Sequence, residues 1–460
     1  MSLQEVDVAI IGSGPAGMSA AMAAREHGLK VTVLDEQPSA GGQIYRGVLS
    51  VPKERSKIIG SDYEVGRSLA KEFSKCGAQR LLGASVWQVT KDRRIDYLQD
   101  GQHHELQANA IILCTGAMER PFPVPGWTLP GVMTVGGAQI LLKTADAVPA
   151  GSVVLAGCGP LLLLLAVQYI RAGLRVTAIV DTTDTSNWWH AIPYLPSALR
   201  DWRLLTKGIG LIRELHRSGT TLFKGVSDIT IEGETQVRAI HFRVGKIEHR
   251  VQTQLVLLHQ GVIPNTQITR SLRAEHNWDQ AQLCFTPILS EYGELVGRPG
   301  FYVAGDGARI MGAMASVSSG RIAGLSAAHA VIGENFTQEI SASINLEVCK
   351  LKVLTAARPM LDRLYMPKIQ SRIPQDSVVV CRCEEVTAGE IRQHVRAGCI
   401  GPNQLKAYSR CGMGPCQGRQ CGITVCEIIA AERGVTPTEI GYQRVRNPIK
   451  PITVGELAGF

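Results

Sequence analysis

The sequence predicts an α/β protein with two parallel-sheet domains followed by a small cysteine-rich domain. Two observations predict the sheets: an apolar strand runs into a glycine-rich turn near residue 12, and the same arrangement returns near residue 157. The third observation is a concentration of cysteines after residue 380. The chain has 460 residues, 45% of them hydrophobic, which is enough for two or three domains with separate cores.

The first glycine-rich turn has the pattern of a dinucleotide site. Residues 6–11 form an apolar strand that leads into Gly12-Ser13-Gly14-Pro15-Ala16-Gly17 and then a helix over 18–27. In such a turn the first glycine permits the bend, the second lets backbone approach a pyrophosphate, and the third lets the helix pack close to the strand. The pyrophosphate then lies at the helix N-terminus, where free N–H groups favour negative charge.

The end of the next predicted strand supplies the acid that such a site needs. Residues 30–34 are typical of a strand, which ends at Asp35 with Glu36 beside it. A carboxylate at this position can hold ribose hydroxyls. We assign the ribose to Asp35 by its register, with Glu36 as the alternative. A glycine-rich turn without a ligand, the competing interpretation, would not need the acid.

Charge and hydropathy disfavour two classes of partner. Net charge is +8, and no run of lysine and arginine is interleaved with aromatics, so we do not expect nucleic-acid binding. The longest apolar run, 161–167, is far shorter than the roughly 20 residues that span a bilayer, and no basic-then-apolar leader precedes the first strand. We expect a soluble cytoplasmic protein with no transmembrane segment. Its twelve cysteines should remain thiols or bind metal.

Three later segments are expected near the same nucleotide. The run Gly41-Gly42-Gln43-Ile44-Tyr45-Arg46 contains a glycine pair that can approach a flat or charged ligand, although an interpretation without cofactor contact is equally open. A buried strand over 110–113 ends in Cys114-Thr115-Gly116-Ala117, where small residues let the chain pass under a cofactor. A short strand over 301–304 ends at Gly305-Asp306-Gly307, whose acid can accept hydrogen bonds from a ribityl chain. Prolines between 121 and 130 mark a crossover to a second domain.

The second unit repeats the first with one change. Residues 153–156 lead into Gly157-Cys158-Gly159-Pro160-Leu161-Leu162, so that Leu162 stands where the third glycine should be. A leucine there separates helix from strand and narrows the room for a pyrophosphate. We therefore expect no NAD(P) here and favour a structural domain that has lost its nucleotide. Residues 226–256 predict antiparallel strands, and the tryptophans in the basic, helical stretch 183–218 predict core packing or a subunit contact.

The cysteines of the C-terminal third indicate a metal site. Cys381 and Cys383 follow a predicted strand, and Cys411, Cys416 and Cys421 follow in a glycine-rich stretch. Cysteines one residue apart are not easily bridged to each other, whereas four thiolates hold a [2Fe–2S] cluster or a zinc ion. Two further cysteines, Cys399 and Cys426, are expected to be buried hydrophobes.

As a set, the first turn, Thr115-Gly116-Ala117 and Gly305-Asp306 resemble the flavoproteins of glutathione-reductase type, which have two Rossmann-like domains. The resemblance covers about the first 335 residues and implies FAD. Members usually carry a redox-active cysteine pair two residues apart, which is missing before residue 380, so a disulfide reductase is disfavoured. The residues assigned to FAD are Gly12, Ser13, Gly14, Pro15, Ala16, Gly17, Asp35, Glu36, Gly42, Gln43, Thr115, Gly116, Gly305 and Asp306.

The cysteine-rich segment resembles the bacterioferritin-associated-ferredoxin (BFD) type of iron–sulfur domain, in which Cys-x-Cys is followed about thirty residues later by a second pair. The resemblance implies Cys381, Cys383, Cys416 and Cys421 as ligands of a [2Fe–2S] cluster. The last two are separated by four residues where the family has two, so Cys411 is a possible substitute. Zinc remains the alternative metal.

Together these parts, with the Gly41–Arg46 stretch and the 411–421 loop, resemble the alpha-type subunits of heteromeric flavin-dependent amino-acid dehydrogenases, a group with opine oxidases, hydroxyproline dehydrogenases and hydrogen cyanide synthase. The resemblance implies that a flavin-containing catalytic beta subunit oxidises an amino acid or opine, with or without a small ferredoxin-like subunit. This chain would relay the electrons through FAD and the cluster. A stand-alone NAD(P)H-dependent reductase and an assembly scaffold with a structural nucleotide are the alternatives.

These interpretations divide the chain into five parts. Residues 1–125 and 280–335 are expected to form the FAD-binding domain, with 126–279 inserted as the second nucleotide-binding-like domain. Residues 336–376 are expected to be a helical linker, 377–435 the BFD-like domain and 436–460 a C-terminal tail. The terminal electron acceptor, the substrate and the stoichiometry are not determined by the sequence.

Overall fold

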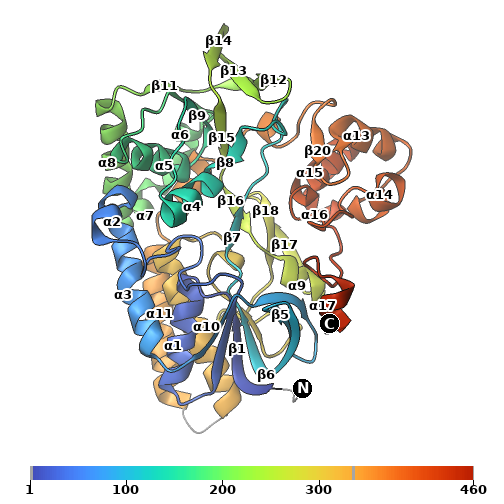
Figure 1. The fold of residues 1–460 in the computed structure, drawn as a ribbon. Coiled ribbons are helices and arrows are strands. Elements are labelled where there is room, and N and C mark those ends of the chain that lie inside the picture. The colour runs from blue at the N-terminus through green and yellow to red at the C-terminus, as the bar shows by residue number, and fades with distance from the viewer. Residues whose placement is uncertain (1–3, 334–336, 459–460) are drawn as a thin grey trace.

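The first domain is built on a mixed sheet whose core is parallel (Figure 1). The computed structural model describes residues 4–333 and 337–458. The strands of this sheet are β1 (Gln4–Ile11), β2 (Val31–Asp35), β3 (Gln79–Leu82), β4 (Ser85–Val89), β5 (Arg94–Gln99), β6 (Gln102–Leu113) and β19 (Phe301–Val303). Their order is β3-β2-β1-β6-β5-β4, and β19 also pairs with β6. β3, β2, β1, β6 and β19 are parallel, whereas β4, β5 and β6 form an antiparallel meander.

The predicted first unit is confirmed as a strand, turn, helix and strand. Alternate residues of β1 enter two different cores: Val8 and Ile10 face one side of the sheet, and Ala9 and Ile11 face the other. A strand buried on both faces has the continuous apolar run that the sequence shows. The helices of this domain are α1 (Pro15–Glu26), α2 (Lys53–Ile59), α3 (Ser61–Lys75), α9 (Gln267–Ser271), η3 (Gly305–Gly307) and α10 (Ala313–Ile332), and a hairpin adds β17 (His276–Asp279) and β18 (Cys284–Pro287).

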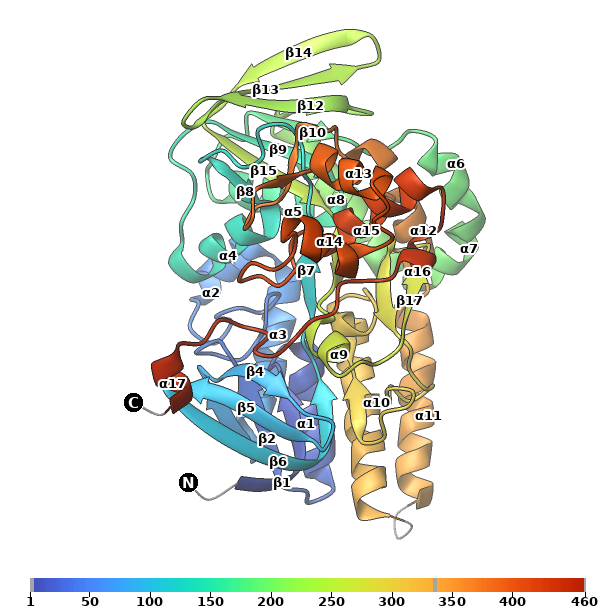
Figure 2. The ribbon, with the colours of Figure 1, turned by 90° about the vertical axis from the view of Figure 1, so that its right-hand side faces the viewer.

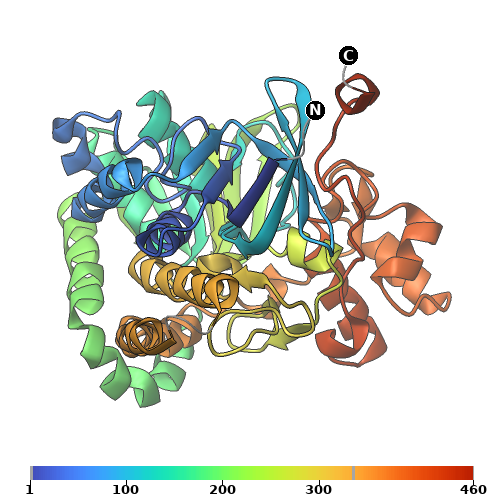
Figure 3. The ribbon, with the colours of Figure 1, turned by 90° about the horizontal axis from the view of Figure 1, so that it is seen from below.

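Small residues set the distance between α1 and α10. A Cβ at Gly320 would lie 2.1 Å from the Ala16 carbonyl oxygen, and one at Gly324 would lie 2.5 Å from that of Ala20. Backbone at this separation admits only glycine on α10. Figure 3 shows α1 and the two orange helices, α10 and α11 (Thr337–Leu354), nearly end-on beside the sheet.

The second domain is a five-stranded sheet of order β11-β10-β9-β15-β8, parallel throughout. Its strands are β8 (Val132–Thr134), β9 (Val153–Cys158), β10 (Ala178–Asp181), β11 (Thr221–Phe223) and β15 (Leu255–Gln260). The antiparallel strands expected over 226–256 are confirmed as β12 (Ser227–Gly233), β13 (Val237–Val244) and β14 (Ile247–Gln252). The chain crosses between the domains through the antiparallel pair β7 (Ala117–Glu119) and β16 (Val262–Pro264).

The helices of the second domain include a chain of short elements on its outer side. α4 (Val135–Ala145) and α5 (Pro160–Arg171) pack on the sheet, with Leu142, Leu162 and Leu165 in the shared core. The elements that follow β10 are α6 (Asn187–Ala191), η1 (Ile192–Tyr194), α7 (Leu195–Ala198), η2 (Leu199–Asp201) and α8 (Trp202–Arg217).

The C-terminal part is a helical connection, a small helical domain and a tail. α11 and α12 (Arg358–Leu364) fall within the predicted linker, whose first residue, 336, lies outside the described residues along with 334 and 335. The elements that follow are η5 (Ile369–Ser371), β20 (Val379–Cys381), β21 (Val386–Thr387), α13 (Ala388–Arg396), α14 (Pro402–Ser409), α15 (Gly422–Arg433), α16 (Pro437–Ile440) and α17 (Val454–Ala458).

The tail returns to the first domain (Figure 2). Val445 and Ile449 are buried in the same core as β1 and β6, and the Ile449 N–H donates to the Trp87 carbonyl at 2.9 Å. The tail therefore fastens the cysteine-rich domain to the sheet. None of the helices within the described ranges has the length and apolar character needed to cross a membrane.

Candidate cofactor site and cysteine cluster

At two of the three glycine positions of the first turn, any larger residue would clash with backbone. Gly12 has φ +103°, and a Cβ there would lie 2.3 Å from the Cys114 carbonyl oxygen. A Cβ at Gly17 would lie 1.8 Å from the Gly12 carbonyl oxygen. Gly14 differs, because its Cβ would meet only the Gly42 Cα, at 3.7 Å. A Cβ at Gly14 would therefore clash with nothing, so this position does not need glycine for the fold itself, and the glycine fits the close approach of a pyrophosphate.

The helix after the turn offers free donors. The N-cap of α1 is Gly14, which makes no side-chain capping hydrogen bond, and Pro15 is its first helical residue. The next N–H groups of the first turn have no intrahelical partner and can bind an anion. The predicted glycine pair lies here too, because the Gly41 N–H donates to the Ser13 carbonyl at 2.9 Å and a Cβ at Gly42 would lie 2.8 Å from the Gly14 Cα.

The two candidate ribose acids have different surroundings. Asp35 is buried; its Oδ2 accepts from the Ser13 N–H and Oγ, each at 2.6 Å, and its Oδ1 accepts from the Gln37 N–H at 2.8 Å. Asp35 therefore fixes the shape of the turn, and a carboxylate retains lone pairs for a ribose. Glu36 is about half exposed and forms an ion pair with Lys450 of the tail. The tail thus contacts the residue next to Asp35.

The other predicted segments converge on the same turn. A Cβ at Gly305 would lie 2.8 Å from the Ala16 Cβ, and one at Gly307 would lie 2.9 Å from the Thr115 Oγ1. The Asp306 Oδ1 accepts from the N–H groups of Met311 and Gly312 at 2.8 and 3.0 Å. Asp306 therefore orders the loop before α10, and its role toward a ribityl chain stays a prediction.

A buried lysine that the sequence did not single out connects the second domain to this site. Lys143 of α4 donates from Nζ to the carbonyls of Gln43 and Ile44 at 3.1 and 3.0 Å, and to the Gln139 Oε1 at 2.9 Å. Burial, with the Arg46 charge as a smaller cause, lowers the pKa of Lys143 to about 7. A lysine inside a helix carries no sequence signal of such a contact, because the two carbonyls lie about a hundred residues away in the chain.

The lowered pKa makes stability depend on pH. Since an unfolded lysine titrates near 10.4, the unfolded chain binds the extra proton between about pH 7 and 10, and the free energy of unfolding rises with pH over that range. We expect wild-type protein to gain about 2 kcal/mol relative to Lys143→Met between pH 7 and pH 9. Urea unfolding of both proteins at the two pH values measures this difference. Parallel pH profiles would contradict the burial of this amine.

The second glycine-rich turn packs closely against His259, a residue of β15 in the same domain. Gly157 and Gly159 have φ of +137° and +113°, and a Cβ at Gly157 would lie 1.6 Å from the His259 carbonyl oxygen. The His259 Nε2 lies 3.5 Å from the Cβ position of Gly159, and its Nδ1 lies 2.6 Å from the Glu119 Oε1. Leu162, expected to crowd a pyrophosphate, is buried in the core of the second domain.

The linker after α12 lies across the carboxyl ends of this sheet, where open α/β sheets bind ligands. The Cys158 Sγ, at the end of β9, donates to the Tyr365 carbonyl at 3.5 Å. The Asn187 Nδ2 donates to the carbonyls of Leu364 and Met366 at 3.3 and 3.2 Å. Lys368 reaches the carbonyls of residues 225 and 226, just after β11. The linker thus covers this edge of the second sheet.

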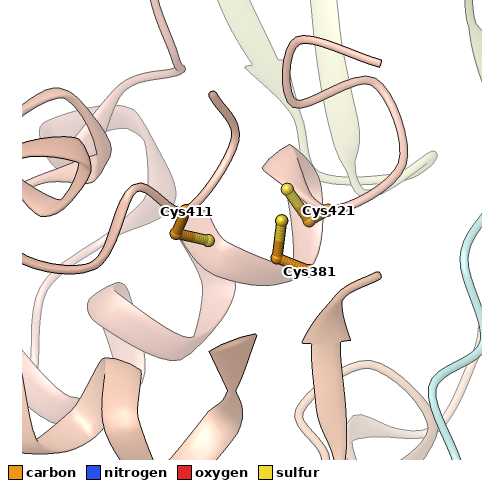
Figure 4. Close-up of side chains that lie close together, drawn as sticks. All are labelled: Cys381, Cys411 and Cys421. Carbon is orange, nitrogen blue, oxygen red and sulfur yellow. The ribbon is translucent and has the colours of Figure 1, made fainter. Parts of the chain in front are cut away.

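The cysteine-rich domain brings three sulfurs together (Figure 4). The Sγ atoms of Cys381, Cys411 and Cys421 lie within 4.8 Å of one another, and all three residues are buried. They come from the end of β20, the loop after α14 and the N-cap of α15. Cys399 and Cys426 are buried in the apolar core of the domain, as predicted.

The remaining two predicted ligands lie beside these three. Cys383 is exposed, and its side chain hydrogen-bonds to that of Cys416. A Cβ at Gly414 would lie 3.2 Å from the Cys383 Sγ, so this glycine lets the loop approach the sulfur. The structure therefore gathers five cysteines and groups Cys411 with two of the four assigned ligands. Which four bind remains a prediction.

The electrostatics of the sulfurs suit a thiolate site. Hydrogen bonds from the Cys411 and Cys421 thiols, with further ones from the N–H groups of Gly412 and Glu384, lower the pKa of Cys381. The hydrogen bond to Cys381 raises the pKa of both Cys411 and Cys421. A metal centre would allow all of them to ionise. The soft sulfur donors and the backbone N–H groups fit an iron–sulfur cluster, and also fit zinc.

A residue of the tail organises the cysteine loop. Gln443 is buried, and its side chain occupies the space beside three glycines of the loop, so that a Cβ at Gly418 would lie 1.5 Å from its Oε1 and one at Gly412 would lie 2.2 Å from its Nε2. This role was not predicted, although glycines at 412, 418 and 422 were a signal that something packs there. Gln443 thus packs with the cysteine domain although it lies beyond the predicted boundary at 435.

Three residues connect the flavin-type site to the cysteine loop. The Thr115 Oγ1 donates to the Asn265 carbonyl at 2.7 Å, and the Asn265 N–H donates to the Gly116 carbonyl at 2.9 Å. Two residues further on, the Gln267 Nε2 donates to the Cys416 carbonyl at 3.5 Å. The segment 265–267 thus contacts both the turn expected under the flavin and the loop that carries the cysteines.

The fold, the first glycine-rich turn and the cysteine cluster are those of a two-domain flavin oxidoreductase with an added cysteine-rich domain. The family model for pyridine nucleotide-disulphide oxidoreductases matches residues 6–321, and that for the sarcosine oxidase A3 domain matches residues 376–460. The chain therefore belongs to the pyridine nucleotide-disulphide oxidoreductase family and, within it, to the alpha-type subunits of heteromeric flavin dehydrogenases represented in the opine oxidases.

Curated relatives support the second assignment. The matching opine oxidase subunit of Agrobacterium tumefaciens is 42% identical over 100% of this chain and 94% of its own length. Its counterpart in Rhizobium meliloti (strain 1021) is 40% identical over 98% of each chain. Hydrogen cyanide synthase subunit HcnB of Pseudomonas aeruginosa is 29% identical over 96% of each. The solved L-proline dehydrogenase from P. horikoshii shares the fold, with a TM-score of 0.70 at 19% identity over 99% of this chain and 80% of that chain.

Proposed function

We propose that this chain is the cytoplasmic electron-transfer subunit of a heteromeric dehydrogenase for an amino acid or opine, of the D-amino-acid or hydroxyproline type. A flavin-containing catalytic beta subunit would oxidise the substrate, with or without a small ferredoxin-like subunit in the complex. FAD and a [2Fe–2S] cluster in this chain would pass the electrons to an acceptor. The opine oxidase relatives and the family models support FAD and a partner subunit.

The observation that carries this proposal is the bridge from Thr115 and Gly116, through residues 265–267, to the Cys416 loop. The bridge brings the turn expected under the flavin close to the loop that carries the cysteines, and electron transfer requires its two centres to lie close together. FAD supplies the exchange between paired and single electrons, and a cluster accepts one electron at a time. The protein's part is to hold the pyrophosphate at Gly14 and α1, to keep the bridge rigid, and to offer thiolates and backbone N–H groups to the cluster.

The alternative is a stand-alone reductase driven by NAD(P)H. The linker argues against it, because Tyr365 and Lys368 cover the carboxyl ends of the second sheet, the edge at which such sheets bind ligands. A scaffold with a purely structural nucleotide would not need an electron path between the nucleotide and the cysteines.

The test is anaerobic addition of NADH or NADPH to the purified, flavin-loaded chain. We expect no bleaching of the flavin and no heat of binding in calorimetry, because the chain occupies the second nucleotide edge. Substrate added to the co-purified complex should bleach the flavin instead. Rapid reduction by either nicotinamide at micromolar concentration would overturn the relay assignment in favour of the reductase.

A further inference from the structure

The outer helices of the second domain expose an unusual amount of apolar surface. Trp188, Trp189 and Trp202 are 56%, 76% and 60% exposed, and they are three of the six tryptophans in the chain. Ile192, Leu199 and Ile209 of the same run of helices are each about half exposed. We call these six residues the tryptophan surface. Together these six side chains expose roughly 700 Å², distributed over α6, η1, η2 and α8.

The helices that carry this surface are anchored from behind. Ala191, Ala198 and Leu215 are buried, and Asn187 bonds to the carbonyls on either side of Tyr365. Asp201 caps α8, since its Oδ1 accepts from the Leu204 N–H. Arg171 of α5 forms a two-point ion pair with Glu214 of α8 at 2.7 Å. The inner sides of these helices are thus packed and hydrogen-bonded to the rest of the domain, and their outer apolar side chains are available to another molecule.

The charges around the tryptophan surface are mainly positive. Arg200, Arg203 and Arg213 are exposed and form no salt bridge within residues 4–333 and 337–458. The two acids of this stretch are already used, Asp201 in the helix cap and Glu214 with Arg171. Interfaces between proteins are enriched in tryptophan and arginine and depleted in lysine and acids, as this surface is.

We propose that the tryptophan surface is the docking site for the catalytic flavin subunit, through a partner face with an apolar centre and an acidic rim. The exposed area is close to the roughly 800 Å² per partner of a stable interface. A second copy of this chain would bring its excess positive charge against itself. A membrane-bound amphipathic helix is continuous, whereas this surface is divided among α6, η1, η2 and α8, with Pro193 and Pro196 between α6 and η2.

The position of the surface fits a relay. The green helices α6 to α8 lie on the opposite side of the molecule from the red C-terminal domain (Figure 3). A partner docked there leaves the exposed Cys383 and its loop free for an electron acceptor. The inference rests on the proposed function, since its partner is the catalytic subunit.

The experiment co-expresses the catalytic subunit with this chain and measures the affinity of the purified pair by sedimentation or interferometry. Trp189→Glu places a charge at the most exposed tryptophan and should not disturb folding. We expect the dissociation constant to rise at least about 30-fold, the effect of losing one central interface residue. Ile247→Glu, at a 65% exposed apolar residue of β14, is the matched control and should bind like wild type.

The outcomes separate this inference from the proposed function. A wild-type complex that Trp189→Glu leaves intact would refute the docking site and preserve the relay. Dissociation by both variants alike would refute it too. A dimer of the isolated chain that Trp189→Glu splits would assign the surface to a second copy, and flotation with phosphatidylglycerol vesicles that Trp189→Glu abolishes would assign it to a membrane. Absence of any complex with the wild-type chain would contradict both proposals.

Discussion

Gly14→Val protein should purify without its flavin. The position tolerates a side chain in the empty fold, because its Cβ would meet only the Gly42 Cα at 3.7 Å and its backbone has ordinary angles of φ −71° and ψ −174°. The valine would instead fill the space that the pyrophosphate needs and separate it from the N–H groups of α1. Loss of several charge-assisted hydrogen bonds corresponds to roughly 3 kcal/mol, or about two orders of magnitude in affinity.

The measurement is flavin absorbance per chain, with circular dichroism to show that the fold is retained. Gly210→Val is the control for the added volume, since a Cβ there has nothing within 4 Å. Normal yellow colour and flavin content in Gly14→Val protein would contradict the assignment of the first turn to the FAD pyrophosphate.

Cys383→Ser should abolish the visible bands of the cluster and the dye-linked dehydrogenase activity of the whole complex. The partner's flavin should still be bleached by substrate, because substrate oxidation takes place before the relay. Cys383 is exposed, so its replacement by serine should leave the buried trio and the domain core in place. Cys349→Ser, at another exposed cysteine but on α11, is the matched control and should keep both properties.

Two further variants decide the ligand set. If the assigned set is correct, Cys421→Ser removes iron and Cys411→Ser retains it. Loss of iron in Cys411→Ser with retention in Cys383→Ser or Cys416→Ser would instead make the buried trio the core of the site. Full activity of the Cys383→Ser complex with no iron would contradict the relay itself.

The sequence predicted those parts of the molecule whose patterns are local. The strand, turn and helix around Gly12 follow from the steric needs of three glycines within six residues, and β1 from an apolar run buried on both faces. The antiparallel strands of 226–256 were likewise foreseeable. The gathering of the cysteines follows from thiolate chemistry, because so many in one reduced segment need a common partner.

The missed features depend on contacts between distant segments. Lys143 meets the Gln43 carbonyl across a domain boundary, Gln443 enters the cysteine loop from the tail, and Tyr365 covers the second sheet edge from the linker. None of these three residues belongs to a sequence motif, and each has its role only because folding brings it to a distant segment. The sequence also did not show that Cys411, and not Cys416, lies with Cys381 and Cys421, since the spacing of cysteines does not say which way a loop folds.

The central claim is that these cysteines hold an electron-carrying cluster. The most direct test is the content of iron, zinc and acid-labile sulfide in the chain purified under anaerobic conditions. We predict about two iron atoms and about two sulfides per chain, with zinc far below one. Stoichiometric zinc with no iron and no labile sulfide would contradict the relay and leave a structural metal site.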